Sequence, residues 1–213
     1  MKQLLVRRGL SLATLALGAL MVMMLSPSKP LNAATIVGTA HDLSGKGWGT
    51  NQVCIFCHTP HNANTTVAGA PLWNHAVTTA TFSTYSSDTL NATVGQPDGV
   101  SKLCLSCHDG TVALDSFGNN AGTHLMDPGG TLVGTDLKND HPVSFTYDAA
   151  LATADGGLVT PTSASWVDAT HNVPLYGAKL QCASCHNVHD NSIGKFLRMS
   201  NAGSALCLKC HAK

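Results

Sequence analysis

The chain has 213 residues, of which 44% are hydrophobic and only 11% are charged. Twelve Lys and Arg residues balance twelve acidic residues, all of which are aspartate. Four of the basic residues lie within positions 1–33, so the rest of the chain carries 12 − 4 = 8 basic residues and is mildly acidic. This composition offers no basic surface to neutralise a phosphate backbone, which excludes nucleic acid as a partner.

Residues 1–33 are predicted to form a cleaved signal peptide. The basic start "MKQLLVRRGL" precedes the apolar run "LSLATLALGALMVMML", which is too short and wrongly flanked for a convincing membrane span. Two prolines and then the small residues Ala33 and Ala34 follow. We expect cleavage after Ala33 or Ala34, no membrane span in the mature protein, and export from the cytoplasm. The alternative is an uncleaved N-terminal anchor.

The mature chain, 34–213, is predicted to be one mostly irregular, loop-rich domain with a few short helices. It is rich in Gly, Asn, Thr, Ser and Asp, and no stretch sustains a helical apolar period over three turns. Short helical turns are expected in "SKLCLSCHDGTVALDSF", "AKLQCASCHNV" and "AGSALCLKCHAK", and a short strand in "HPVSFTYD". So little regular structure should not bury an adequate core unaided, so something else must fill the interior.

Every cysteine belongs to a C-x-x-C pair that is followed at once by histidine. We number these motifs from first to fourth, at residues 54–58, 104–108, 182–186 and 207–211. In C-x-x-C-H the two thiols form thioethers to a c-type haem while the histidine binds the iron from one face. The predicted attachment residues are Cys54, Cys57, Cys104, Cys107, Cys182, Cys185, Cys207 and Cys210. The predicted proximal ligands are His58, His108, His186 and His211.

Zinc binding and disulfides are the competing explanations of the cysteine pairs. C-x-x-C pairs do bind structural zinc, but zinc does not require a histidine directly after the second cysteine. A disulfide within such a pair would close only a very small loop. We therefore expect four covalent haems, and about 45 residues for each ring means that neighbouring rings touch and replace the missing core. The predicted arrangement is a stacked chain of four haems.

Each of the four haem irons has one proximal histidine. If the irons only carry electrons, each needs a second, distal axial ligand, which makes four more ligands in all. The mature chain contains two methionines, Met126 and Met199, but seven histidines outside the motifs. This supply favours two histidines per iron, and the scarcity of methionine points to low-potential haems. The predicted distal ligands are His41, His61, His141 and His189; His75, His124 and His171 are reserves.

His61 follows His58 by three residues and cannot ligate the same iron. Two histidines on opposite faces of one ring need α-carbons roughly 12–13 Å apart, given metal–nitrogen bonds of about 2 Å. Three extended residues span at most about 11 Å. The same spacing separates His186 and His189, which suggests a duplicated haem-pair unit at about 34–120 and 170–213, joined by a loop-rich segment. We expect His61 to serve the second motif's haem and His189 the fourth's, which leaves the first and third haems to His41 and His141, in an order that the sequence leaves open.

The segments "HDLSGKG", "CIFCHTPHN", "APLWN", "CLSCHDGTVALDSFG", "NDHPVSF" and "CASCHNVHD" resemble the multihaem cytochromes of metal-reducing bacteria with paired C-x-x-C-H motifs. The likeness covers essentially the whole mature chain and is closest to the tetrahaem, extracellular, filament-forming outer-membrane cytochrome E type. It implies bis-histidine haems in a continuous chain of parallel and T-shaped pairs. It also implies that a histidine of one subunit can ligate a haem of the next, and His41, on an N-terminal arm, matches that residue best.

The function expected from these features is electron transfer out of the cell, as a subunit of a cytochrome filament or as a discrete periplasmic carrier. A multihaem reductase is a weaker alternative because all four motifs keep histidine and no iron is evidently left open. A redox subunit docked on a membrane complex is a third. The expected partners are other copies of the chain, other multihaem cytochromes or extracellular acceptors, and the expected location is extracellular or the cell surface.

Overall fold

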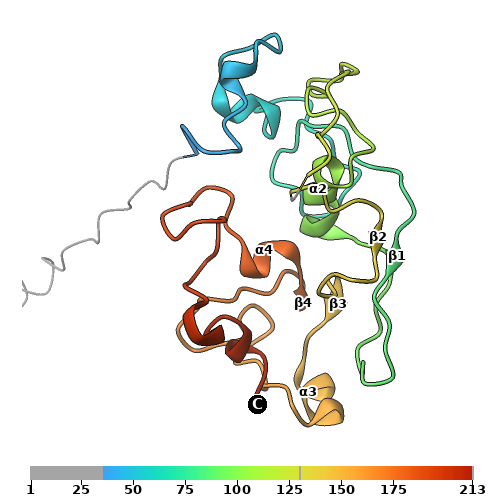
Figure 1. Ribbon diagram of the computed structural model, residues 1–213, viewed down its shortest axis with the longest axis vertical. Coiled ribbons are helices and arrows are strands. Elements are labelled where there is room, and N and C mark those ends of the chain that lie inside the picture. Colours follow the sequence, from blue (N-terminus) through green and yellow to red (C-terminus); the bar gives the residue numbers. More distant parts are fainter. Residues whose placement is uncertain (1–35, 130, 213) are drawn as a thin grey trace, which may run out of the picture. The chain divides into compact units, whose positions relative to one another are not determined.

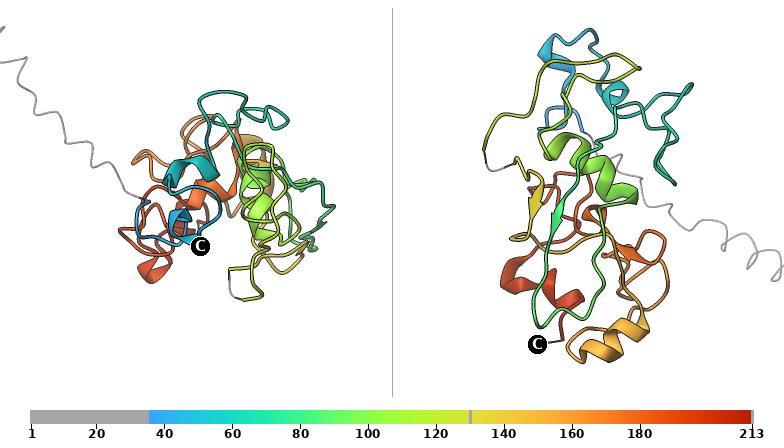
Figure 2. Two further views of the ribbon diagram at one scale, coloured as in Figure 1. Left: turned by 90° about the horizontal axis from the view of Figure 1, so that it is seen from above. Right: turned by 90° about the vertical axis from the view of Figure 1, so that its right-hand side faces the viewer.

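The computed structural model describes residues 36–129 and 131–212, so the predicted signal peptide and its cleavage point lie outside the described residues. Residues from Ala34 to Lys213 form one compact unit. Most of this unit is loop (Figures 1 and 2). The prediction of a loop-rich fold with a few short helices is confirmed.

The described helices are short, and four of them contain cysteines of the C-x-x-C-H motifs. The longest is α2 (Gly99–His108), which spans the second motif, and α4 (Cys182–Cys185) spans the cysteines of the third. The first and fourth motifs lie on the 3₁₀ turns η2 (Val53–Phe56) and η4 (Cys207–Lys209). The others are η1 (Ser44–Lys46), α3 (Ala149–Asp155) and η3 (Ala202–Ser204).

Four two-residue strands form two small sheets. Strand β1 (Ser83–Thr84) pairs in parallel with β2 (Asp136–Leu137), with Ser83 opposite Asp136. Strand β3 (Phe145–Thr146) pairs antiparallel with β4 (Lys179–Leu180), with Phe145 opposite Leu180. β3 lies within the stretch predicted to be strand-like. β4 leads directly into α4, so the second sheet fixes the entry to the third motif.

A buried polar network joins the start of α2 to the start of α4. Asp98 precedes α2 but does not cap it; its carboxylate pairs with Lys179 and accepts a hydrogen bond of 2.9 Å from Gln181 Nε2. The other amide atom, Gln181 Oε1, accepts hydrogen bonds from the Ser101 backbone N–H at 3.2 Å and from Ser144 Oγ at 3.0 Å. This network fixes the second motif against the third.

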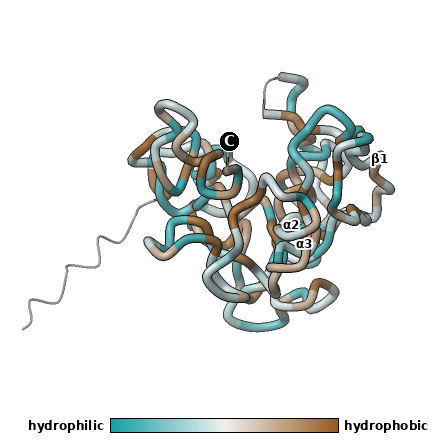
Figure 3. The backbone as a smooth tube through the Cα atoms, turned by 90° about the horizontal axis from the view of Figure 1, so that it is seen from below, coloured by the Kyte–Doolittle hydropathy of each residue, from teal (hydrophilic) through white to brown (hydrophobic). Residues whose placement is uncertain are grey.

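Apolar side chains form three separate clusters rather than one continuous core. The largest contains Phe145, Tyr147, Val167, Val173, Leu175, Leu180 and Leu206. A second contains Val67, Trp73 and Leu103, and a third Phe82, Leu105 and Leu137. Hydrophobic residues accordingly occur as short stretches between hydrophilic ones along the chain (Figure 3). Cysteines border two of the clusters: Cys57 lies on the second, and Cys185 and Cys210 on the largest.

Candidate functional site

Each C-x-x-C-H motif closes a single helical turn. The histidine N–H donates to the carbonyl of the first cysteine in the first, third and fourth motifs, at 2.8, 3.1 and 3.0 Å. Residues three and four apart on a helical turn lie on the same face. The turn therefore directs two thiols and one imidazole towards a common side, which is the arrangement needed to hold one haem at three points.

The three imidazoles of His58, His108 and His186 are oriented by backbone carbonyls. Their Nδ1 atoms lie 2.6 Å from Pro71 O, 2.8 Å from Thr131 O and 2.9 Å from Lys195 O, respectively. A carbonyl oxygen only accepts, so Nδ1 carries the hydrogen in each ring and Nε2 keeps its lone pair. Such a second partner is what fixes the tautomer of a metal-binding histidine.

Three pairs of imidazole rings lie at closely similar separations; two pairs are edge-to-face, with interplanar angles of 64° and 77°, and one is nearly parallel at 19°. Two imidazoles on opposite sides of one metal have ring centroids roughly 6.3 Å apart, given metal–nitrogen bonds of about 2.0–2.1 Å. The observed centroid distances are 6.0 Å for His41 and His108, 6.1 Å for His58 and His189, and 6.4 Å for His141 and His211. Each pair joins one motif histidine to one predicted distal histidine. The residues present thus fit a six-coordinate haem iron at three of the four motifs.

The environment of His41 keeps its ring neutral. Burial, followed by the nearby charges of His108, His189 and His186, lowers the pKa of His41 to about 4. Its Nδ1 is buried without a hydrogen-bond partner, and the ring contacts Phe196 with centroids 4.5 Å apart. Burial and the neighbouring His58 likewise lower the pKa of His189. Neutral imidazole is the form that binds a metal.

The ring contacts bear on the expected pairing of the histidines, which stays a prediction. The ring of His189, which we expect to serve the fourth motif, lies beside His58 of the first, with an interplanar angle of 19°. The rings of His41 and His141, which we expect to serve the first and third motifs, lie near His108 of the second and His211 of the fourth. The expected bridge from His41 to another subunit likewise stays a prediction. Among the described residues, neither His61 nor His186 has a ring of another residue stacked against it. The choice of the four distal histidines itself stays a prediction.

The three reserve histidines have other partners. Both ring nitrogens of His75 lie near carbonyl oxygens, Nδ1 at 2.7 Å from Ala76 O and Nε2 at 3.0 Å from Ala113 O. His124 Nδ1 lies 2.8 Å from the Asp115 carboxylate, and the ring of His171 packs against Trp166 at a tilt of 33°, with centroids 4.7 Å apart. His75 Nε2 also lies 3.7 Å from Sγ of Cys107, so His75 adjoins the second motif as well.

Cysteines of different motifs lie near one another. Cys104 and Cys182 form a side-chain hydrogen bond that, together with burial, raises the pKa of Cys104. Burial, then the nearby Cys57, raises the pKa of Cys107 to about 12, and burial, then Cys185, raises that of Cys210 to about 11. The attachment points of the second motif therefore lie close to those of both the first and the third.

Asp168 holds the fourth motif through Lys209, the residue before Cys210. Lys209 Nζ lies 3.4 Å from Asp168 Oδ1, and the Val173 N–H donates to Asp168 Oδ2 at 2.9 Å. Burial alone would raise the pKa of Asp168, but hydrogen bonds from Thr170 and Val173 and the charge of Lys209 outweigh it and lower the pKa to about 2.

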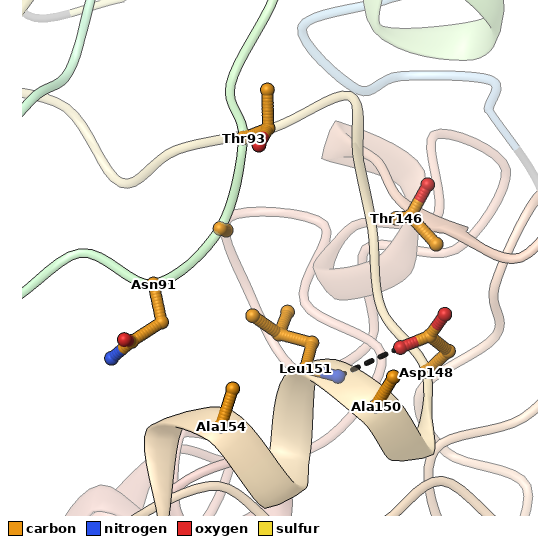
Figure 4. A pocket seen from close by; sticks show the side chains of 8 residues that line it. Asn91, Thr93, Thr146, Asp148, Ala150, Leu151 and Ala154 are labelled. Atoms are coloured by element: carbon orange, nitrogen blue, oxygen red, sulfur yellow. Dashed lines mark hydrogen bonds between the residues drawn. The ribbon is translucent and has the colours of Figure 1, made fainter.

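One cavity is lined in part by His75, whose Nε2 lies 3.7 Å from Cys107 Sγ, and another lies away from the motifs. This second cavity, of about 380 Å³, lies beside α3, where the Asp148 carboxylate accepts a hydrogen bond of 2.8 Å from the Leu151 N–H (Figure 4). None of the predicted site residues lines this cavity. Over residues 36–129 and 131–212, no three His, Cys, Asp or Glu side chains are grouped to hold a metal ion. In that same part of the chain, no helix is long and apolar enough to cross a membrane.

Sequence reasoning missed the residues that orient the site. The acceptors of the three Nδ1 atoms are backbone carbonyls, which leave no mark in the side-chain sequence. Gln181 and Asp98 lie 83 positions apart, and no spacing rule connects them. The one available signal was "APLWN", whose Pro71 supplies the carbonyl that orients His58.

Comparison with known proteins supports the class of protein that this geometry describes. The family with the doubled CXXCH motif matches residues 175–213, which contain the third and fourth motifs. That match indicates covalently bound c-type haem and a multihaem c-type cytochrome in electron transfer, a class of carriers that are usually not enzymes. None of the curated proteins gives a significant match to the chain.

Proposed function

We propose that the protein is a tetrahaem c-type cytochrome that carries electrons and has no catalytic site of its own. The observation that carries this proposal is the set of three imidazole pairs with ring centroids 6.0, 6.1 and 6.4 Å apart, each of which includes the histidine of a C-x-x-C-H motif. When bound, a haem iron supplies one-electron redox chemistry. An iron held by one of these three imidazole pairs would have no coordination position left for a substrate.

In this function the chain's residues hold and orient the haems. The paired thiols fix each ring on its helical turn, and the carbonyls of Pro71, Thr131 and Lys195 fix three proximal imidazoles. We assign His41 to the second motif's iron and His141 to the fourth's, because these rings face His108 and His211. The Gln181 network keeps the second and third motifs in contact, which electron transfer between their haems requires.

Haem content and spin state test this function. The protein is expressed with a c-type haem maturation system, and its intact mass is compared with that of the polypeptide. We expect four covalent haems, all low-spin with two nitrogen ligands. A methionine-to-iron charge-transfer band in the oxidised protein, or a mass corresponding to fewer than four haems, would contradict the proposal.

We further propose that the mature protein acts outside the cell and assembles with copies of itself into a filament that passes electrons to other multihaem cytochromes or extracellular acceptors. The signal-like N-terminus and the resemblance to the filament-forming cytochromes support this step. Electron microscopy of the secreted fraction tests it: filaments are expected, and a monomeric protein confined to the periplasm would make it a discrete carrier.

The bridge through His41 is a separate prediction within this proposal. If His41 ligates a haem of the next subunit, His41→Ala removes both one sixth ligand and the filaments. If it ligates the second motif's haem in its own chain, as the contact with His108 favours, the same variant loses the ligand but keeps the filaments.

A further inference from the structure

Arg198 is the one arginine outside residues 1–33, and its guanidinium lies against the third C-x-x-C-H motif. Its Nε donates a hydrogen bond of 2.6 Å to the carbonyl of Ala183, which lies between the two cysteines of that motif in the sequence. Its backbone N–H donates to the Cys185 carbonyl at 2.9 Å. The positive charge of this side chain is therefore fixed beside the attachment point of the third haem.

A second contact holds the guanidinium of Arg198 in place. Its Nη2 donates a hydrogen bond of 2.8 Å to the hydroxyl of Tyr176, on the turn that precedes β4. Tyr176 is itself fixed by two backbone hydrogen bonds with Lys179, of 3.0 and 3.2 Å. The third motif and the turn that leads to it therefore both anchor this side chain.

The acceptors of the Arg198 guanidinium are neutral groups, so no neighbouring carboxylate cancels its charge. Over residues 36–129 and 131–212, the ion pairs involve three lysines and one histidine, and none involves Arg198. The cation beside the fourth motif, Lys209, is by contrast paired with Asp168 at 3.4 Å. Arginine keeps its charge in proteins. Arg198 thus supplies the third motif with a permanent positive charge.

The charge of Arg198 is partly shielded from water. Arg198 is half-buried, whereas Lys195, three residues earlier in the same loop, is exposed. Burial, followed by neighbouring cysteines, raises the pKa of Cys185, and the charge of Arg198 acts in the opposite direction. Water and salt screen a half-buried charge less than an exposed one. Arg198 should therefore act on the third haem more strongly than Lys195 does.

The direction of the effect on a haem follows from Coulomb's law. A haem iron carries one more positive charge when oxidised than when reduced, so a fixed positive charge nearby opposes oxidation and raises the reduction potential. The axial ligands do not distinguish the haems when every iron has two histidines, as the proposed function requires. Differences in potential then come from the surroundings of each ring.

We propose that Arg198 tunes the third haem: its fixed charge raises the reduction potential of that haem. This inference rests on the proposed function. Cys182 of the third motif lies close to Cys104 of the second, and Cys185 lies close to Cys210 of the fourth. The third attachment site is thus adjacent to two others, and Arg198 favours an electron at this interior haem.

The test compares Arg198→Gln with Lys195→Gln, because each removes one positive charge from the same loop by the same substitution. The haem-loaded proteins are titrated electrochemically while NMR follows the methyl signals of each haem, assigned through contacts with the cysteines of its motif. At a fixed potential, the ratio of reduced to oxidised third haem should fall about tenfold in Arg198→Gln, as Coulomb's law gives for two unit charges about 12 Å apart at an effective dielectric constant of about 20. This is a shift of about 59 mV for a one-electron couple. Lys195→Gln should change the ratio by less than about twofold.

Two further variants separate the charge of Arg198 from its hydrogen bonds. Arg198→Lys keeps the charge but loses the planar fork of donors, so the ratio for the third haem should fall much less than in Arg198→Gln. An equal fall in both variants would assign the effect to hydrogen bonding and overturn the proposal. Tyr176→Phe removes only the hydroxyl that anchors Nη2 and should lower the ratio by a smaller factor, because the freed guanidinium becomes more solvated.

An unchanged third haem in Arg198→Gln, an equal shift in Lys195→Gln, or a shift confined to another haem would overturn the role of Arg198. Should Arg198→Gln fail to accumulate, Tyr176→Phe decides, and no downward shift of the third haem in that variant would overturn the proposal. These outcomes apply to a wild-type protein with four low-spin haems. A wild-type mass corresponding to fewer than four haems would instead reject the proposed function, so the two failures are distinguishable.

Discussion

Replacement of Gln181 by leucine should destabilise the protein by disconnecting the second motif from the third. Gln181 is only 2% exposed and makes three side-chain contacts that leucine cannot make: with the Ser101 N–H, with Ser144 Oγ and with the Asp98 carboxylate. Leucine has a similar volume, so the change removes hydrogen bonds without opening a large cavity. Methionine is avoided because its thioether could bind iron.

The expected loss follows from these three contacts. Each hydrogen bond contributes about 1 kcal/mol, and the Ser101 N–H near the start of α2 is left buried without an acceptor, which makes the total about 3 kcal/mol or more. For a urea dependence of about 2 kcal/mol per molar, the unfolding midpoint should fall by about 1.5 M. Asp98 keeps its contact with Lys179, which limits the loss at that end of the network.

The assay follows tryptophan fluorescence of the haem-loaded protein during urea titration, since haem quenches tryptophan until the chain unfolds. Gln52→Leu is the control, because Gln52 is exposed and its side chain makes no capping hydrogen bond. Its midpoint should change by less than about 0.3 M, in keeping with an effect within about 0.5 kcal/mol. Equal shifts in the two variants, at equal haem content by mass, would refute the role assigned to the network.

Three further outcomes follow from the structure. The pKa of Asp168 is about 2 in the folded protein and about 3.8 when unperturbed. The ionised carboxylate therefore stabilises the fold fully above pH 4, and this stabilisation is lost as the pH falls towards 2. Asp168→Asn should accordingly lower the urea midpoint of unfolding at pH 6 but not at pH 2. His75→Phe should lower thermal stability yet leave every haem low-spin, and a high-spin signal would make His75 a ligand. His41→Ala should leave one five-coordinate haem, on the tryptic peptide 103–138 that carries the second motif. Loss of the sixth ligand from the haem of another motif would contradict the pairing of His41 with His108.

Local spacing predicted the parts of the structure that local interactions determine. The helical turns at the motifs follow from C-x-x-C-H itself, since its groups must converge on one side, and α2, α4 and η4 lie where the sequence indicated. The loop-rich character followed from the absence of an apolar period. The contact of α2 with α4 could not be predicted from the sequence, because the side chains that make it are common polar residues at distant positions.

The pairing of proximal and distal histidines shows where sequence reasoning stops. A proximal histidine has a fixed place after its cysteines, but a distal histidine has only to reach the iron and can come from anywhere in the chain. The expectation that each end forms its own haem pair rests on sequence proximity, and it stays a prediction. The contact of His189 with His58 joins residues 189 − 58 = 131 positions apart.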